Sequence, residues 1–239
     1  MPITDANTKK EMEAKRAAQQ KQIQQVQAKI DPIEEQLLDE LAKKNPALKE
    51  KAPKDNKKLN NPFALPDASR GKGQIWEYTF EKPGDNWFEI AYDDRAWKKD
   101  WSGFGRKGRP GSHVRTEWHT RDIWLRKDFR LVEIPGKLVL RIHHDEDAQV
   151  YLNGKLVKTL KGHANRYLDM DITEAAIDVM QTGRNTLAIH CQQTAAGQYI
   201  DAGLLVDYNI TPVPLLARLH GKAILGEAKL AEYNQLRQQ

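Results

Sequence analysis

The sequence of 239 residues lacks the features that mark several large classes of protein. Its single cysteine, Cys191, cannot form a disulfide within the chain, which leaves the redox compartment open. No apolar run approaches the roughly 18 residues that a membrane-spanning helix requires, so we expect no membrane partner. The first residues, Met1 to Asp5, lack the apolar stretch of a signal peptide. This observation fits both a fragment of a longer protein and a cytosolic protein.

The middle of the chain has no excess of positive or of negative charge. The net charge is +5, but residues 71–211 carry 20 Lys/Arg and 20 Asp/Glu, so the excess lies in residues 1–70 and 212–239. A neutral centre with mildly basic flanks is not typical of nucleic-acid-binding proteins. We therefore expect no nucleic-acid partner.

Cofactor motifs are missing as well. No Cys/His spacing supports zinc, no Cys-x-x-Cys-His indicates c-type haem, and the glycine-rich residues 103–111 lack the Gly-Lys-Ser/Thr ending of a phosphate loop. Asp145-Glu146-Asp147 or Asp93-Asp94 could help to hold a structural calcium ion. No loop has calcium-binding spacing, however, which favours a solvated acidic turn. We expect no cofactor and no metal, with calcium as the open alternative.

The clearest positive feature is a hairpin. An alternating run from Asp145 ends in Asn153-Gly154, and another run begins directly after it. Asn-Gly tolerates positive φ at both central positions, which a type I′ turn needs. Turn residues also separate further β-type runs, and together the runs are 75–80, 121–131, 137–143, 148–153, 155–160, 184–192 and 198–208. Short strands at this spacing indicate a β-sandwich, with a short helix expected at 173–181.

Helices are predicted at both ends of the chain. Apolar residues recur at three- and four-residue spacings over 8–44, a narrow seam of the coiled-coil type, and we expect a kink or a restart at Pro32. A second helical pattern follows Pro214. Because each stripe must be covered, we expect the two helices to pack antiparallel, or else to pack on the sandwich or on missing parts of a longer chain. The predicted segments are a helical segment 1–45, a linker 46–74, a sandwich 75–210 and a C-terminal helix 211–239.

Several short motifs in the middle of the chain share an order and spacing. They are Trp97 in 92–97, Phe104-Gly105, Thr116-x-Trp118, Asp122-Ile123-Trp124-Leu125-Arg126, Val150-Tyr151-x-Asn153-Gly154, Asp169-x-Asp171-Ile172-Thr173 and Gly183-x-Asn185-Thr186-Leu187-Ala188. In these residues the chain resembles the jelly-roll sugar-binding domain attached to glycoside hydrolases such as the family 2 β-galactosidases, and galactose-binding-like sandwiches generally. The resemblance covers about 75–210.

This resemblance implies a mainly β fold, an antiparallel jelly-roll β-sandwich. The flanking helices, which we expect from their apolar stripes to form a coiled-coil-like hairpin, depart from the family pattern. It implies a carbohydrate-related role without its own catalytic residues, because the catalytic barrel of the hydrolases has no counterpart in this chain. It also favours an extracellular or periplasmic location, and as partners the remaining domains of a longer parent chain.

Strand alternation separates an apolar face from an unusual outward face. In 121–131, for example, Ile123 and Leu125 share the face that we expect to point inward. The outward positions carry rings and planar hydrogen-bonding groups, which suit a sugar's C–H face and its hydroxyls. The predicted ligand-binding residues are Trp124, Arg126, Arg141, His143, Tyr151, His190, Gln192, Tyr199 and Asp201. The alternative is an ordinary polar exterior divided between two sheets.

A basic, aromatic loop is the secondary candidate. Residues 98–115 hold six Lys/Arg and one Asp. Such a loop could bind an anionic glycan by charge and stacking, although Trp97 and Phe104-Gly105 also match structural positions of the resemblance. The secondary binding residues are Trp97, Trp101, Arg106, Lys107 and Arg109.

Nucleophilic catalysis finds little support. His190 and Cys191 are adjacent on a predicted strand, so they point to opposite faces and cannot act as a pair. The sequence therefore predicts a non-catalytic module that binds a glycan or polysaccharide, neutral or anionic, within a larger polysaccharide-processing protein. The alternatives are a structural or assembly domain without its own ligand, and a small hydrolase built on the sandwich.

Overall fold

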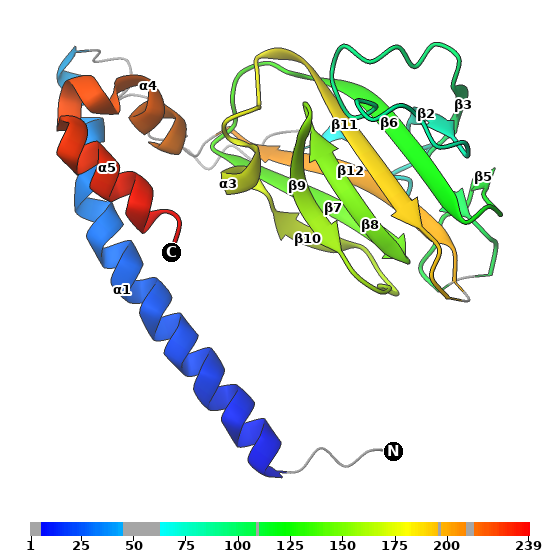
Figure 1. Cartoon of the computed structure of the whole chain (residues 1–239), viewed down its shortest axis with the longest axis horizontal. Helices are drawn as coiled ribbons and strands as arrows, with labels where there is room; N and C mark the ends of the chain where they lie inside the picture. The colour runs from blue at the N-terminus through cyan, green and yellow to red at the C-terminus, as the bar shows by residue number, and fades with distance from the viewer. Residues whose placement is uncertain (1–5, 45–62, 109, 196, 209–212) are drawn as a thin grey trace. The chain divides into compact units, whose positions relative to one another are not determined.

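A computed structural model describes residues 6–44, 63–108, 110–195, 197–208 and 213–239. The chain divides into two compact units, one of Met1–Lys51 with Val213–Gln239 and one of Ala52–Pro212. The helices, shown in Figure 1, are α1 (Ala6–Lys44), α3 (Thr173–Ala176), α4 (Val213–Leu225) and α5 (Glu227–Leu236). The strands are β1 (Phe63–Leu65), β2 (Ile75–Thr79), β3 (Lys98–Trp101), β4 (Phe104–Gly105), β5 (Thr116–Glu117), β6 (Asp122–Leu131), β7 (Lys137–Asp145), β8 (Asp147–Leu152), β9 (Lys155–Leu160), β10 (Leu168–Asp171), β11 (Gly183–Gln192) and β12 (Tyr199–Asp207).

The strands form two six-stranded sheets, so the prediction of a mainly β fold is confirmed. Sheet A has the order β10-β7-β12-β4-β5, with β1 also paired to β12, and its β4–β5 pair is parallel. Sheet B has the order β3-β2-β6-β11-β8-β9 and is antiparallel throughout. Residues 145–147 connect the two sheets, because β7 belongs to sheet A and β8 to sheet B.

Alternation along the strands correctly predicts which side chains form the interior. Ile123 and Leu125 of β6 are 0% and 2% exposed. The other predicted inward positions of the long strands are equally buried, namely Leu138, Leu140, Ile142, Val150, Leu152, Leu187, Ile189, Cys191, Ile200, Ala202 and Leu204. A slip by one residue would turn this apolar set to the opposite face, so its burial fixes the register of these strands. Several predicted outward positions of β6, β11 and β12 are buried as well.

The predicted hairpin is present. Asn153 and Gly154 adopt φ values of 49° and 92° between β8 and β9, as a type I′ turn requires. Asn153 is also held from its side chain, since its Nδ2 donates to Asn185 Oδ1 at 2.7 Å and Thr186 N donates to its Oδ1 at 2.7 Å. These bonds tie the turn to β11, so the hairpin is a fixed edge of sheet B.

Five strands were not expected from the sequence: β1, β3, β4, β5 and β10. Each has two to four residues, too few for an alternating pattern to be recognised. β1 lies in the segment predicted as a linker, of which residues 46–62 are outside the described residues. The expected helix at 173–181 is shorter, Thr173–Ala176.

The helical unit buries one stripe of α1 against α4 and α5. Its core comprises Ile30, Ile33, Leu37, Leu41, Ala217, Tyr233 and Leu236. Tyr233 Oη and Arg237 Nη1 also reach Glu34 Oε1, at 2.8 and 3.1 Å. Figure 1 shows α5 beside the C-terminal half of α1. Toward the N-terminus the seam is uncovered, since Ile23 is 54% exposed.

Two expectations about the helices need correction. The C-terminal segment is not one helix but two, because Gly226 takes a φ of 79° that α-helical residues do not adopt. Gly221 of α4 then lies so close to Leu230 of α5 that a Cβ would fall 2.6 Å from Leu230 Cδ1. A restart at Pro32 is also wrong, because α1 runs from Ala6 to Lys44 without a break, whereas a kink there stays a prediction. Within the described residues, none of the helices has the length and apolarity needed to cross a membrane.

Covered and uncovered positions of the α1 seam should respond differently to truncation. Leu37→Ala should destabilise the helical unit by about 2–5 kcal/mol, because Leu37 is fully buried. Ile23→Ala, on the same seam but exposed, should change stability by less than about 0.5 kcal/mol. Hydrogen exchange of the α1 amides measures both effects, and equal protection loss in the two variants would contradict this packing.

Candidate functional site

The nine residues predicted to bind a ligand lie on two different sheets. Sheet B carries Trp124 and Arg126 on β6, Tyr151 on β8, and His190 and Gln192 on β11. Sheet A carries Arg141, His143, Tyr199 and Asp201 on β7 and β12. The expectation of one shared face is therefore wrong, because alternation identifies outward positions but not the sheet to which each strand belongs.

Most of the sheet B group is covered by residues 80–97, which we call the cover segment. Trp87, Trp124 and Ala188 form a buried cluster, with Phe88, Tyr92, Trp97 and Tyr151 packed against it. Trp124 is 8% exposed. The Tyr151 ring stacks on Phe88 at 4.6 Å between centroids and an interplanar angle of 5°. Trp124 and Tyr151 thus give their faces to other side chains and do not form the open stacking surface that the sequence suggested.

Arg126 fastens the cover segment to sheet B. Its side chain is 1% exposed, and its Nη1 donates to the carbonyl oxygens of Trp87 and of Glu89, the latter at 3.0 Å. Its Nε donates to Asp94 Oδ2 at 2.7 Å, and its guanidinium lies 5.4 Å from the centre of the Tyr92 ring. A planar guanidinium can satisfy several fixed acceptors at once. The predicted role of Arg126 in ligand binding is therefore replaced by a structural one.

The sheet A group is also buried. His143, Tyr199 and Asp201 are 1%, 0% and 2% exposed. Tyr167 Oη donates to Asp201 Oδ2 at 2.7 Å and lies 3.1 Å from Tyr199 Oη. Arg141 Nε lies 3.2 Å from the buried Asp67, and its Nη1 lies 2.8 Å from Asp169. An exposed sugar-binding role for His143, Tyr199 and Asp201 is thus not supported, because each is enclosed by its neighbours.

Burial dominates the electrostatics of this group. Desolvation raises the pKa of Asp201 from 3.8 to about 7, against the opposing effect of the hydrogen bonds from Tyr167 and from the Ala68 amide, and the nearby Asp67 raises it further. Desolvation, followed by the charge of Asp201, also raises the pKa values of Tyr167 and Tyr199. The protonated form of Asp201 is thus the one that the folded protein favours.

The secondary candidate residues do not converge on one site. Trp97 packs against Tyr92 in the cover segment, with ring centroids 5.8 Å apart, whereas Trp101 on β3 is 38% exposed. Arg106 and Lys107 are exposed in the loop after β4, and Arg109 lies outside the described residues. Lys107 does line an open hollow of about 420 Å³ with His113 and Arg115. Arg115 Nη2 in turn donates to Gly71 O at 2.6 Å, so its charge is partly engaged within the protein.

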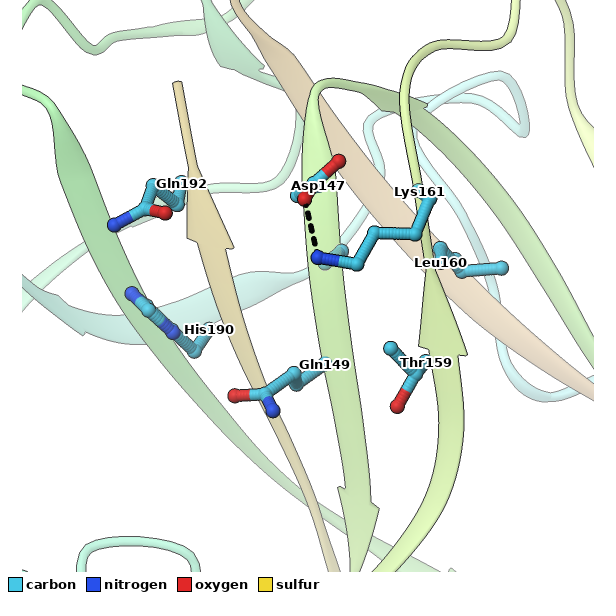
Figure 2. A pocket seen from close by; sticks show the side chains of 8 residues that line it. Asp147, Gln149, Thr159, Leu160, Lys161, His190 and Gln192 are labelled. Carbon is cyan, nitrogen blue, oxygen red and sulfur yellow. Dashed lines mark hydrogen bonds and ion pairs between the residues drawn. The ribbon is translucent and has the colours of Figure 1, made fainter. Parts of the chain in front are cut away.

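A polar hollow on sheet B brings together side chains from three neighbouring strands (Figure 2). It is lined by Asp147 and Gln149 from β8, by Thr159 and Leu160 from β9 with Lys161 just after it, by His190 and Gln192 from β11, and by Ala148. Its volume is about 190 Å³, below the roughly 300–1,000 Å³ of pockets that enclose drug-sized ligands. The hollow therefore has room for about one small polar ligand.

The groups in the polar hollow are held in fixed directions. His190 Nε2 lies 2.8 Å from Asp122 Oδ1, to which Gln192 Nε2 also donates at 3.1 Å. The His190 ring stacks on Trp124 at 4.7 Å with an interplanar angle of 8°. Across the hollow, Lys161 Nζ lies 2.6 Å from Asp147 Oδ2, and this bond and that from the Gly162 amide lower the pKa of Asp147. Carboxamides, an imidazole, a hydroxyl and an ion pair thus line one hollow.

His190 and Gln192 are the two predicted ligand residues that the structure brings into this hollow. The sequence analysis missed Asp147, Gln149, Thr159 and Lys161. Alternation does place Gln149 outward. The register of β8 and β9 shifts between Val150 and Tyr151, however, so the pairing of Gln149 with Thr159 could not be read from the Asn153-Gly154 turn. Among the described residues, no group of three or more His, Cys, Asp or Glu could hold a metal ion.

Arg126 should be essential for the cover segment. Arg126→Met should destabilise the strand unit by about 2–4 kcal/mol, because it removes the hydrogen bonds to two carbonyls and leaves Asp94 without its cation. Lys137→Met, which breaks the exposed pair with Asp171 on sheet A, should cost less than about 1 kcal/mol. Hydrogen exchange over residues 84–97 should accelerate only in Arg126→Met, and unchanged exchange there would contradict the role assigned to Arg126.

Asp201 should make the strand unit less stable as the pH rises. Its pKa in the folded protein, about 7, lies above the ordinary 3.8, so its favourable contribution is complete below about pH 4 and is lost as the pH rises through 7. The loss is on the order of 4 kcal/mol. Denaturant unfolding at several pH values should show this slope in the unaltered protein and in Asp169→Asn, an exposed control, but not in Asp201→Asn. Equal slopes in all three proteins would refute the assignment.

Comparisons with protein families and with curated proteins find no match for this chain. Among solved structures, the chain is similar to a β-glycosidase from Bacteroides vulgatus (16% identity over 56% of this chain and 20% of that one, TM-score 0.39). It is also similar to a glycosyl hydrolase family 2 member from Bacteroides cellulosilyticus (14% identity, 55% and 20% covered, TM-score 0.40). A third is β-glucuronidase 2 from Bacteroides uniformis (14% identity, 54% and 18% covered, TM-score 0.39). The chain spans about a fifth of the length of these glycosidase chains.

Proposed function

We propose that the strand unit is a non-catalytic carbohydrate-binding module of the jelly-roll type, and that the polar hollow of sheet B is where the sugar binds. The observation that carries this proposal is the convergence of Gln149, Gln192, His190 and Thr159 from three paired strands. Sugar hydroxyls need donors and acceptors in fixed directions, and Asp122 fixes both His190 and Gln192. The exposed part of the His190 ring, backed by Trp124, offers a flat surface to a C–H face.

The size of the hollow sets the kind of ligand. A volume of about 190 Å³ accepts one sugar residue and not a long segment of polysaccharide. Binding that depends on a few neutral hydrogen bonds is weak, because each contributes only about 0.5–1.5 kcal/mol after desolvation. Such a module gains from attachment to a larger polysaccharide-processing protein, which would act outside the cell or in the periplasm. The motif resemblance over 75–210 supports the same assignment.

A structural or assembly role is the second candidate. It is favoured by the cover segment, which hides Trp124 and Tyr151, and by the assembly of the helical unit from both ends of the chain. In that role the strand unit would act as a spacer with no ligand of its own. Failure to bind any glycan would support this candidate, whereas turnover of a glycoside by the purified protein would support a hydrolase.

Binding to a panel of neutral and anionic glycans tests the proposal. Gln149→Ala and Gln192→Ala should each weaken binding about fivefold or more, because each removes a hydrogen-bonding group worth about 1 kcal/mol. Gln181→Ala, an exposed glutamine outside the hollow, is the matched control and should bind like the unaltered protein. Titration calorimetry with the best glycan measures all four proteins, and equal affinities would contradict this location for the site.

A further inference from the structure

A second hollow, which we call the acceptor hollow, lies on the other side of the connection between β7 and β8. Its volume is about 220 Å³, and it is lined by His143 and Asp145 from β7, by Glu146, by His163, and by Ala195 and Gly197 among others. Asp145 and Glu146 line this hollow, and the next residue, Asp147, lines the polar hollow. Two other segments also contribute residues to both hollows. At the end of β9, Lys161 lines the polar hollow and His163 the acceptor hollow, and at the end of β11, Gln192 lines the polar hollow and Ala195 the acceptor hollow.

The two hollows are therefore neighbours. Three consecutive residues span at most about 7 Å between the first and third Cα. A ligand of two or three sugar residues is long enough to place a group in each hollow. The arrangement makes the acceptor hollow a candidate for a second subsite of the same glycan.

His143 supplies the acceptor hollow with a buried nitrogen. The residue is 1% exposed, and its Nδ1 has no hydrogen-bond partner among the described residues. Burial lowers the pKa of His143, although the backbone of Ala164 and of Gly111 favours its protonated form. A neutral imidazole has one N–H, and we assign it to Nε2 because Nδ1 is the nitrogen without a partner, so Nδ1 is the nitrogen that accepts. An acceptor left without a donor in a buried position is costly unless a ligand satisfies it.

Two carboxylates line the same hollow as His143. Glu146 is 3% exposed, and its Oε2 accepts from the amides of Thr194 and Ala195 at 3.0 and 2.9 Å. Asp145 is 8% exposed and lies against Gly197, where a Cβ would fall 2.0 Å from its Oδ2. Only glycine leaves room for the carboxylate at this position. The hollow thus combines two carboxylates with a neutral acceptor, a set that is complementary to a cationic donor.

From this geometry we infer that the acceptor hollow binds a primary ammonium group, and that the glycan bound by this protein contains an amino sugar. An ammonium carries three N–H donors and no acceptor, which matches His143 Nδ1, Asp145 and Glu146. Hydrogen bonds between charged groups are also about twice as strong as neutral ones. The inference rests on the proposed carbohydrate-binding function, since the neighbouring polar hollow would hold the hydroxyls of the same ligand.

Paired oligosaccharides test this inference on the unaltered protein. Titration calorimetry at pH 6.5 would compare a tetramer of β-1,4-linked glucosamine with the matching tetramer of N-acetylglucosamine and with cellotetraose. We expect the amino tetramer to bind at least tenfold tighter than either neutral tetramer. Ethylamine, as a free amine, should bind weakly and compete with the amino tetramer.

Two variants locate the effect. Asp145→Asn keeps the shape of the side chain and removes its charge, so it should reduce the preference for the amino tetramer at least fivefold. Asp169→Asn, an exposed aspartate on sheet A, should leave the preference unchanged. Thermal unfolding checks that both variants are folded. If Asp145→Asn is not folded, NMR spectra of the unaltered protein replace it. An intermolecular nuclear Overhauser effect between the amino tetramer and the His143 ring is then the expected result.

The outcomes separate this inference from the proposed function. Equal binding of the three tetramers would overturn the ammonium site and leave carbohydrate binding intact. Binding of ethylamine without binding of any tetramer would support the ammonium site and contradict the amino sugar. Absence of binding by all four compounds would overturn the inference, and the glycan panel would then decide whether the polar hollow binds another sugar.

Discussion

The arrangement of the strand unit depends on how the Arg126 guanidinium is satisfied. An arginine buried on the outward face of a sheet is unfavourable unless its donors find acceptors. Residues 80–97, folded over sheet B, provide acceptors for Nε and Nη1 of Arg126. The same segment buries Trp87 and brings Phe88 against Tyr151. Arg126 and the cluster of aromatic rings thus hold the cover segment against part of the outward face of sheet B, where it forms a third packed layer. Beyond this layer, β8, β9 and the end of β11 keep polar side chains accessible in the polar hollow.

Sheet A follows the same logic with different chemistry. Its outward face is covered around Asp201, Tyr167 and Tyr199, where hydroxyl and carboxyl groups satisfy one another at 2.7 to 3.1 Å. A buried acid is tolerated there because protonation removes its charge. Polar groups from both sheets line two hollows, to which residues 145–147 contribute in succession. The connection between the sheets is where the two hollows meet.

The sequence predicted the parts of this fold that obey a period. Alternation identified the long strands and the interior positions, and Asn153-Gly154 identified the turn, because these features depend on neighbours in sequence. The cover segment has no period, so alternation could not show that Trp124 would lie under Trp87. Its rings were themselves a signal, since five large apolar side chains between residues 87 and 97 must be buried somewhere. The short strands and the helix break at Gly226 were not predicted for a related reason. Pairings of two to four residues and a single backbone angle produce no recognisable pattern in the sequence.

The helical unit has a consequence for the order in which this protein is made. The stripe of α1 that includes Ile33 and Leu37 is complete by residue 44, but two residues that cover it, Tyr233 and Leu236, are synthesised roughly 190 residues later. At roughly 5–20 residues per second, the interval is on the order of 10–40 s. During that time the apolar stripe of α1 lacks the side chains that cover it in the folded unit, so it is open to contact with other proteins.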